Sequence, residues 1–324
     1  MNNMEIKKIP VLIDCDTGID DILSFVLAFS SNKLDIKGIT TVAGNQKLEY
    51  TTYNTLNALE LMQRFDIPLA KGADKPLERD LKDAGYIHGK SGLGEYVFAK
   101  ETNMKPVELE AMDFLYEKLN MSKEKVIIIA LAPLTNIAKL LMKYPEVKNK
   151  IEKIVFMGGS IRTGNPTPVS TFNVLVDPEA ARYVMKVGVE FEMCPLDTTR
   201  FAYLTDDEIE KINDIKNPVA EMAYQVCDFY NRTTKVSNNG TKRFKGLCIH
   251  DLATVMAVTN PEIFTSKKYY GDVETKGELT TGFTMIDYED ILKKEDNEKN
   301  IKYLESIDRE KFVEIFFEAL NQYN

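Results

Sequence analysis

The stretch from Val11 to Phe25, VLIDCDTGIDDILSF, places four aspartates between two apolar segments. Residues Lys8–Asp14 predict a buried strand, and residues Asp20–Ser31 predict a helix. Two carboxylates about 4 Å apart repel by about 4 kcal/mol at an effective dielectric constant of about 20. A helix N-terminus carries an effective charge of only about +0.5, so it offsets little of this repulsion. Because carboxylate oxygens are the ligands that Ca²⁺ and Mg²⁺ prefer, this junction predicts a metal site.

The rest of the first 200 residues alternates short apolar runs with helical patterns. The expected strands are Lys8–Asp14, Leu34–Val42, Ile67–Ala70, Val126–Leu131, Ile151–Met157 and Val189–Cys194. The expected helices are Asp20–Ser31, Leu48–Phe65, Leu134–Lys143 and Pro178–Val187. This alternation predicts an α/β fold with a mostly parallel central sheet and helices on both faces. Ligands of such sheets bind beyond the carboxyl ends of the strands, where Asp14, Asn45 and Leu131 are expected.

Beyond residue 200 the pattern becomes mainly helical. Asp206–Asp214 and Pro218–Lys235 predict helices, and residues 236–246 form a polar segment that contains glycine. Tyr269–Asp287 predicts a hairpin or meander, and Glu310–Gln322 a last helix. No internal repeat or obvious linker interrupts the chain, so we expect residues 1–324 to form a single domain with a helical cap.

Composition excludes several classes of function. The formal net charge of −9 disfavours nucleic acid and anionic membrane surfaces as partners. The sequence contains no run of 18 apolar residues, so no membrane span is expected. The start of the chain, MNNMEIKKIP, lacks the apolar centre of a signal peptide. The four cysteines are far apart and form no CxxC pair, which favours reduced thiols in a cytoplasmic protein.

Two other motifs share part of the aspartate pattern. An EF-hand loop requires glycine at its sixth position, whereas Gly18 stands at the fifth, so that motif does not fit. Asp14-Cys-Asp16 after a strand also resembles the haloacid-dehalogenase-like phosphatases, in which Asp14 would be the nucleophile of a Mg²⁺-dependent reaction. That family usually has Thr or Val where this chain has Gly18. The phosphatase remains the alternative enzyme.

Histidine and asparagine supply further candidate site residues. The chain has only two histidines, His88 in a glycine-rich loop and His250 beside Asp251. Asp251 could complete a metal site while His250 faces the substrate, since histidine can donate a proton near neutral pH. Three loops rich in neutral polar groups, which suit sugar hydroxyls, end at Asn45, Asn165 and Asn173.

Taken together, these segments resemble the inosine-uridine-preferring nucleoside hydrolase family from about Pro10 to Asp287. The matching motifs are Asp14-Cys-Asp-Thr-Gly-Ile-Asp-Asp21, Thr40–Asn45, Ile87–Leu93, Ala132–Asn136, Met157–Gly159, Phe172–Ala180, Pro195–Asp197 and His250-Asp251. The resemblance implies the open α/β architecture of these enzymes. It also implies hydrolysis of the N-glycosidic bond of a ribonucleoside to ribose and a free base, as in purine or pyrimidine salvage.

The resemblance also implies a role for each candidate residue. One Ca²⁺ would be held by Asp16, Asp21, Asp251 and the backbone carbonyl of Leu131, with Asp14 orienting the others. Asp16 would act as general base on a water whose pKa the ion lowers, and His250 would protonate the leaving base. The substrate-binding residues would be Asp20, Asn45 and Asn173 for ribose, Asn165 for the 5′-hydroxyl and His88 for the base. Tyr230 would stack on the base or simply pack within its helix.

One departure from the family pattern concerns the 5′-hydroxyl. The family usually has Glu two residues before the ribose-binding Asn173, and this chain has Thr171 there. Losing a charged hydrogen bond costs about 1.5–3 kcal/mol, so we expect weakened recognition of the 5′-hydroxyl or a substrate altered at that position. Thr171 also leaves open a non-catalytic ribose- or nucleoside-binding protein, although Asp16, His250 and Asp251 favour an enzyme. The family implies a homodimer or homotetramer, and the sequence alone does not define the preferred base.

Overall fold

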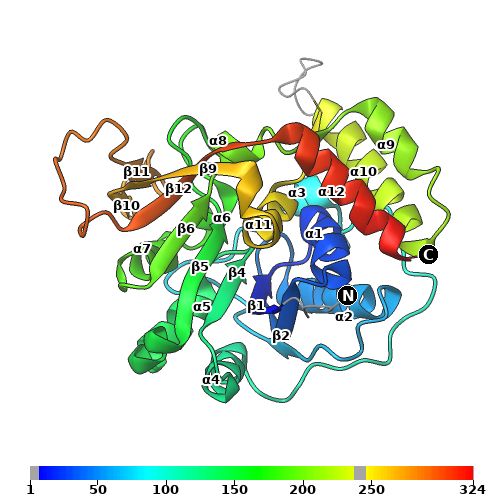
Figure 1. The fold of residues 1–324 in the computed structure, drawn as a ribbon, viewed down its shortest axis with the longest axis horizontal. Coiled ribbons are helices and arrows are strands. Elements are labelled where there is room, and N and C mark those ends of the chain that lie inside the picture. Colours follow the sequence, from blue (N-terminus) through cyan, green and yellow to red (C-terminus); the bar gives the residue numbers. More distant parts are fainter. Residues whose placement is uncertain (1–6, 237–245, 324) are drawn as a thin grey trace, which may run out of the picture.

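The computed structural model describes residues 7–236 and 246–323, and its centre is an eight-stranded sheet (Figure 1). The strand order is β3-β2-β1-β4-β5-β6-β12-β9. The strands are β1 (Ile9–Cys15), β2 (Leu34–Thr41), β3 (Leu69–Lys71), β4 (Val126–Ala130), β5 (Ile151–Met157), β6 (Glu190–Cys194), β9 (Phe264–Tyr269) and β12 (Ile301–Ile307). Every neighbouring pair is parallel except β12 and β9. The expected mostly parallel sheet is therefore confirmed.

The strand order reverses direction between β1 and β4. From β1 the chain continues outward to β2 and β3, and it then returns to the other side of β1 with β4, β5 and β6. At such a switch point the connections leave the two central strands in opposite directions, which opens a crevice at their carboxyl ends. β1 ends at Cys15 and β4 at Ala130, so Asp16 and Leu131 lie at this crevice.

Helices cover both faces of the sheet, as the sequence predicts. Ile13 of β1 and Ile129 of β4 belong to one buried cluster, whereas their neighbours Leu12 and Ile128 belong to another, because successive side chains point to opposite faces. The buried cluster on the first face includes residues of helices α1 (Ile19–Ser30), α2 (Leu48–Leu61), α9 (Asp206–Ile212), α10 (Pro218–Val236), α11 (His250–Thr259) and α12 (Arg309–Leu320). Helices α4 (Ala111–Met121), α5 (Thr135–Lys143) and α7 (Pro178–Lys186) pack on the second.

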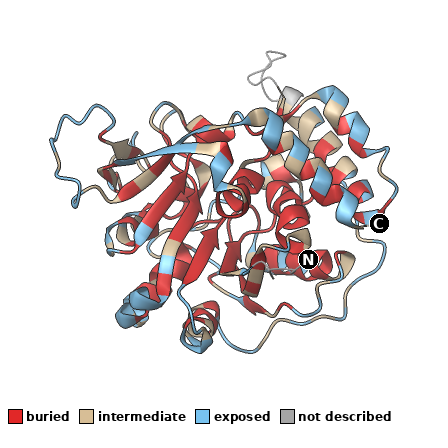
Figure 2. Ribbon diagram, viewed as in Figure 1, coloured by how far each residue is buried: buried red, intermediate tan, exposed pale blue. Residues whose placement is uncertain are grey.

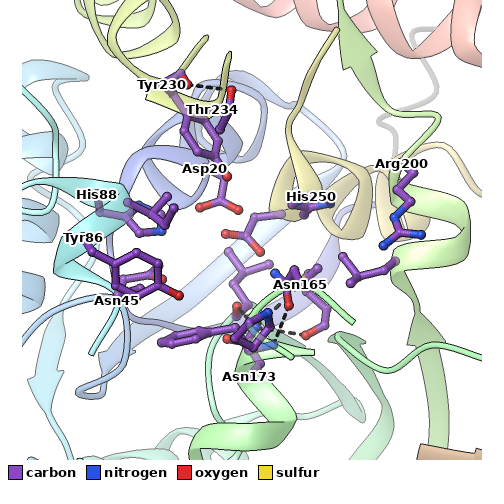
Figure 3. Close-up of a pocket in the computed structure, with 18 residues that line it drawn as sticks. Asp20, Asn45, Tyr86, His88, Asn165, Asn173, Arg200, Tyr230, Thr234 and His250 are labelled. Carbon is purple, nitrogen blue, oxygen red and sulfur yellow. Dashed lines mark hydrogen bonds between the residues drawn. The ribbon is translucent and has the colours of Figure 1, made fainter. Parts of the chain in front are cut away.

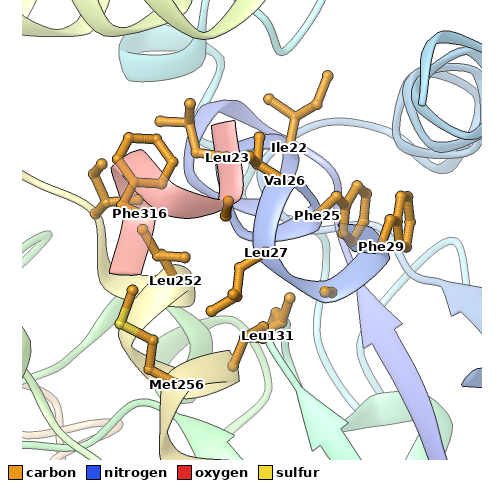
Figure 4. Close-up of a cluster of buried hydrophobic side chains, with 14 of the residues drawn as sticks. Ile22, Leu23, Phe25, Val26, Leu27, Phe29, Leu131, Leu252, Met256 and Phe316 are labelled. Carbon is orange, nitrogen blue, oxygen red and sulfur yellow. The ribbon is translucent and has the colours of Figure 1, made fainter. Parts of the chain in front are cut away.

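The first face carries the helix that follows the aspartates. Leu23 and Leu27 of α1 lie among Leu252 and Met256 of α11 and Phe316 of α12 (Figure 4). The buried residues form a continuous layer through the sheet and the helices beside it (Figure 2). This packing fixes the start of α1 and the start of α11 next to each other, and both starts carry site aspartates.

Several shorter elements complete the described chain. The two-stranded sheets are β7 (Tyr203–Leu204) with β8 (Leu247–Cys248) and β10 (Gly271–Val273) with β11 (Thr284–Ile286). The short helices are α3 (Gly85–His88), α6 (Phe172–Val176) and α8 (Leu196–Thr199), and 3₁₀ turns cover Pro145–Lys150, Pro261–Ile263 and Asn321–Tyr323. The hairpin β10–β11 confirms the prediction for 269–287. The polar segment 236–246 lies, for residues 237–245, outside the described residues.

Strands β9 and β12 were absent from the sequence prediction. β9, with the sequence FTSKKY, is an edge strand with four exposed residues, so it has no apolar alternation to reveal it. β12 fits between β6 and β9 and is buried mainly in its first half. Within 7–236 and 246–323, no helix combines the length and apolar character that a membrane span requires.

Candidate active site

Three carboxylates meet at the crevice between β1 and β4. Oxygens of Asp20, Asp21 and Asp251 all lie within 4.8 Å of one another, and all three residues are buried. One oxygen of Asp20 and one of Asp251 are shielded from solvent without a hydrogen-bond donor among the described residues. Buried carboxylate oxygens that lack donors are costly unless a cation binds them, so this donor set fits a hard divalent ion.

The electrostatics of the cluster support the same interpretation. Burial raises the pKa of Asp21 to about 7, with the charge of Asp20 adding to the effect, and raises the pKa of Asp20 to about 6. Burial, followed by the charges of the neighbouring aspartates, raises the pKa of Asp16 and of Asp251 well above the usual range. A bound cation would reverse these shifts because it favours the ionised forms.

The loop between β1 and α1 holds two of the aspartates in place. Asp21 accepts hydrogen bonds from the backbone N–H groups of Asp16, at 3.2 Å, and of Gly18, at 2.9 Å. Asp16 accepts one from the backbone N–H of Asn45 at 2.7 Å and one from the Asn45 side chain at 3.2 Å. The Asn45 amide also donates to Asp21 at 3.1 Å, so it links the two carboxylates.

Asp14 lies deeper than the other aspartates. It is fully buried, and its Oδ1 accepts hydrogen bonds from Thr40 at 2.5 Å and from Asn136 at 2.8 Å. Burial raises the pKa of Asp14 to about 7. Asp14 does not line the cavity described below, and its two hydrogen bonds join the end of β1 to the end of β2 and to the start of α5. The phosphatase alternative loses its nucleophile, which would have to face a substrate.

A cavity of about 190 Å³ opens over the aspartates (Figure 3). Asp20, Asn45 and Asp251 contribute carboxylate and amide groups to its lining. His88, Tyr230 and His250 stand around it. The other lining residues are Ala84, Tyr86, Ile87, Leu131, Met157, Asn165, Pro166, Phe172, Asn173, Leu196, Arg200 and Thr234. One end of a ligand would therefore contact carboxylates and amides, and the other end would contact the rings of the histidine and tyrosine side chains.

His250 is the first residue of α11, directly before Asp251. Its Nδ1 lies 2.7 Å from the hydroxyl of Thr199, at the end of α8. Burial, followed by the charge of Arg200, lowers the pKa of His250 to about 4. The ring is therefore neutral near pH 7 unless a negative charge develops in the cavity.

His88 approaches from the other side of the cavity. Its Nδ1 accepts a hydrogen bond of 3.1 Å from the backbone N–H of Ile19, the first residue of α1. Tyr230 of α10 stacks against the ring, with centroids 6.0 Å apart and planes inclined by 29°. Burial, followed by the charge of His250, lowers the pKa of His88 to about 4. Tyr230 thus contacts a residue of the cavity wall and is not only a packing residue.

The predicted amides of Asn165 and Asn173 also line the cavity. Asn173 donates through Nδ2 to the carbonyl oxygens of Leu131 at 2.6 Å and of Met157 at 3.0 Å. One lone pair of the Leu131 carbonyl oxygen therefore accepts this hydrogen bond, and its second lone pair can accept a further partner. Asn165 accepts from the backbone N–H of Phe172 at 2.9 Å, which leaves its amide hydrogens for the cavity.

Most of the predicted residues meet at this place, but not all of them line the cavity. Asp16 and Asp21 are fully buried and do not line it, but both accept hydrogen bonds from the lining residue Asn45. Thr171 is also buried and does not line it. The hydroxyl of Thr171 accepts a hydrogen bond of 2.9 Å from the backbone N–H of Gly159, so it supports a loop instead of facing a ligand. The carboxylate cluster contains Asp20, which the sequence assigns to ribose, together with the predicted ligands Asp21 and Asp251.

Three polar lining residues escaped the sequence prediction. Tyr86 stands two residues before His88 on α3, and Thr234 stands one turn after Tyr230 on α10. Arg200 follows the Pro195–Asp197 motif, and its guanidinium donates to the carbonyl of Gly164 at 3.2 Å. Proximity to a recognised motif is the signal that could have identified Tyr86 and Arg200.

Comparisons with known proteins identify similar chains over almost the whole length. The family model described as inosine-uridine preferring nucleoside hydrolase matches residues 11–314. The pyrimidine-specific ribonucleoside hydrolase RihA of Photobacterium profundum is 40% identical over 317 residues, which cover 97% of this chain and 99% of that protein. A plant nucleoside hydrolase, the PpNRh1 enzyme, superposes with a TM-score of 0.90 at 27% identity, covering 97% and 99% of the two chains. The purine-preferring ribonucleoside hydrolase from Gardnerella vaginalis superposes with a TM-score of 0.89 at 26% identity, covering 96% and 98%.

Proposed function

Because the chain belongs to the inosine-uridine preferring nucleoside hydrolase family and is a ribonucleoside hydrolase, we propose that it cleaves pyrimidine ribonucleosides with the help of one Ca²⁺. In the overall reaction the bond between C1′ and the base nitrogen breaks, water adds, and ribose and the free base leave. The pyrimidine preference rests on the name of the relative from Photobacterium profundum. The Ca²⁺ rests on the buried oxygens of Asp20 and Asp251 that have no donor among the described residues, the single observation that carries the proposal.

The ion would be held at the carboxyl ends of β1 and β4. Asp21 and Asp251 are proposed ligands on both sequence and geometry, Asp20 is added by geometry, and Asp16 and the Leu131 carbonyl come from the family pattern. Oxygen ligands of this number and flexibility favour Ca²⁺ over the stricter octahedral Mg²⁺. A bound Ca²⁺ would neutralise the carboxylates and lower the pKa of a water molecule in the cavity.

Asp16 is proposed to take the proton of the attacking water. Its carboxylate is held by Asn45 on both oxygens, so its orientation is fixed before the substrate arrives. A bound cation would keep Asp16 ionised near neutral pH, which is the form that can accept a proton. As C1′ gains positive charge, the surrounding carboxylates would stabilise the sugar, and Asn173 and Asn45 would orient its hydroxyls.

His250 is proposed to protonate the leaving base. The neutral ring holds one transferable hydrogen, and the electrons that move onto the base make that base a strong acceptor. The negative charge that develops on the base would also oppose the effect of burial and raise the pKa of His250 during the reaction. The Thr199 hydroxyl can exchange donor and acceptor roles at the opposite nitrogen as the proton moves.

A panel assay tests the proposal. Calcium-loaded protein should release reducing sugar from uridine and cytidine faster than from inosine and adenosine, and Asp16→Ala should abolish the release. Asp287→Asn is the matched control, because Asp287 is also buried but accepts hydrogen bonds from Ile291 and Leu292 outside the cavity. Faster release from purine nucleosides would refute the pyrimidine preference. Full activity after calcium has been removed would refute the proposed requirement for Ca²⁺.

A further inference from the structure

The start of α1 lacks the side chain that usually caps a helix. The N-cap residue is Gly18, so the first free N–H groups of the helix need acceptors from elsewhere. Asp21 accepts from Gly18, and His88 accepts from Ile19 through Nδ1 at 3.1 Å. His88 thus acts as a cap supplied by a distant loop.

Gly18 also makes room for the ring. A Cβ atom at this position would lie 2.6 Å from Nδ1 of His88 and 2.9 Å from the amide nitrogen of Asn45. Real Cβ atoms do not approach neighbours this closely, so any other residue would push the imidazole away from Ile19. Tyr230 stacks on the ring as well. Glycine therefore fixes where His88 can stand.

The direction of this hydrogen bond defines the tautomer of His88. A backbone N–H is always a donor, so Nδ1 must present its lone pair to Ile19. In a neutral imidazole the one hydrogen then sits on Nε2. His88 lines the cavity, so the substrate meets a ring that can donate there and cannot accept.

We propose that the start of α1 fixes His88 as a neutral hydrogen-bond donor to the leaving base, through Nε2–H. The inference rests on the proposed hydrolysis of pyrimidine nucleosides. When the glycosidic bond breaks, its electron pair passes to the base, and in a pyrimidine the negative charge is shared between N1 and O2. A donor beside these atoms stabilises the charge without giving up its own proton, and the positive end of α1 polarises the ring in the required direction.

The two histidines therefore differ in what they can do. The partner of His250 is the Thr199 hydroxyl, which can donate or accept, so either tautomer of His250 is permitted. The partner of His88 is an amide, which permits only one. His250 is therefore suited to proton transfer. His88 is suited to donating a hydrogen bond to the departing base while it keeps its own proton.

Nitrogen NMR tests the tautomer directly. In tag-free protein labelled with ¹⁵N-histidine, only two imidazoles contribute, and the His88→Gln variant identifies the His88 signals by subtraction. We expect an unprotonated Nδ1 and a protonated Nε2 for His88 at neutral pH. A protonated Nδ1, in either the other tautomer or the cation, would overturn the proposal.

Leaving-group dependence tests the function. His88→Phe keeps a planar ring but no donor, so kcat for uridine should fall by about 10- to 100-fold with little change in KM. The same variant should lose much less activity on 4-nitrophenyl riboside than on uridine, because nitrophenolate leaves without help. His88→Gln retains an N–H donor and should recover part of the loss. Equal losses on both substrates would show that His88 only shapes the cavity. A wild-type protein that cleaves the aryl riboside but no nucleoside would refute the pyrimidine substrate, and NMR would still decide the tautomer.

Discussion

Asp251 brings to the cluster a carboxylate oxygen that has no donor among the described residues. Asp251→Asn removes one negative charge while it keeps the shape and one oxygen ligand. We expect Ca²⁺ affinity to fall by about 10- to 150-fold, because a charged interaction contributes about 1.5–3 kcal/mol. Titration calorimetry with Ca²⁺ measures the change, and the rate of ribose release should fall with it.

The Asp287→Asn variant serves as the comparison for Asp251→Asn. Both changes neutralise a buried carboxylate, but Asp287 accepts backbone N–H groups, from Ile291 and Leu292. The Asp287→Asn variant should have a lower free energy of unfolding than the wild type and an unchanged Ca²⁺ affinity. Equal calcium affinities for Asp251→Asn and the wild type would remove Asp251 from the metal site.

Thr171 leads to a prediction about the substrate rather than the fold. Its neutral hydroxyl accepts from the Gly159 backbone N–H and does not line the cavity, so it cannot hold the 5′-hydroxyl as a carboxylate would. We expect kcat/KM for uridine to exceed that for 5′-deoxyuridine by less than about 10-fold. A preference of about 100-fold or more would show that another group, with Asn165 the first to test by Asn165→Ala, supplies the missing recognition.

At the scale of elements, most of the long ones were predictable, although α4, β9 and β12 were missed, and the shortest were not predictable. The strand and helix around the aspartates begin and end within about one residue of the prediction, because each is long enough to show its period. The short helices α3, α6 and α8 have four or five residues, too few for a helical period. They nevertheless carry His88, Asn173 and Thr199, of which His88 and Asn173 were recognisable by motif although the elements that hold them were not.

The loop after β2 provides a test at this scale. A Cβ atom at Gly44 would lie 2.0 Å from Oδ2 of Asp16, and Asn45 prevents that carboxylate from moving away. Gly44→Ala should therefore displace Asp16 and lower both ribose release and Ca²⁺ affinity by about 10-fold or more. Both quantities can be measured on the same purified protein.

Gly188→Ala is the matched control for Gly44→Ala. Gly188 has a φ of 87°, and a Cβ there would meet nothing within 4 Å. The substitution should cost about 1–2 kcal/mol of stability through backbone strain alone. Urea denaturation should detect this loss while activity and calcium binding stay normal. A Gly44→Ala protein with wild-type calcium affinity would contradict the packing argument.

At the scale of the whole molecule, the site is a product of topology. Asp20 and Asp251 are far apart in sequence and meet because α1 and α11 pack side by side on one face of the sheet. The parallel sheet and the strand-end rule predicted which residues gather at the crevice. They did not predict that the carboxylate cluster contains Asp20 in place of Asp16, or that Arg200 lines the cavity, because side-chain directions there depend on contacts between distant loops.

The buried carboxylates also make the stability of the whole molecule depend on metal and pH together. Without a cation, burial raises the pKa values of Asp14 and Asp21 to about 7 from the ordinary value of 3.8. The folded state then binds more protons than the unfolded state, so the stability of the metal-free protein falls as pH rises through about 7. The two histidines act in the opposite direction, because burial lowers their pKa values to about 4 from 6.5.

The histidine contribution is nearly complete above about pH 7.5, where the unfolded form is also mainly neutral. Between about pH 7 and pH 8 the carboxylates outweigh what remains of the histidine titration, because the pKa values of Asp16 and Asp251 are also raised well above the usual range. In chelator the Tm should therefore fall over this range. With excess Ca²⁺ the carboxylates stay ionised and paired, so the fall should disappear and the gap between the two curves should widen with pH. Calorimetry in EGTA and in Ca²⁺ at several pH values measures both curves. Parallel curves would mean that these aspartates do not hold the ion.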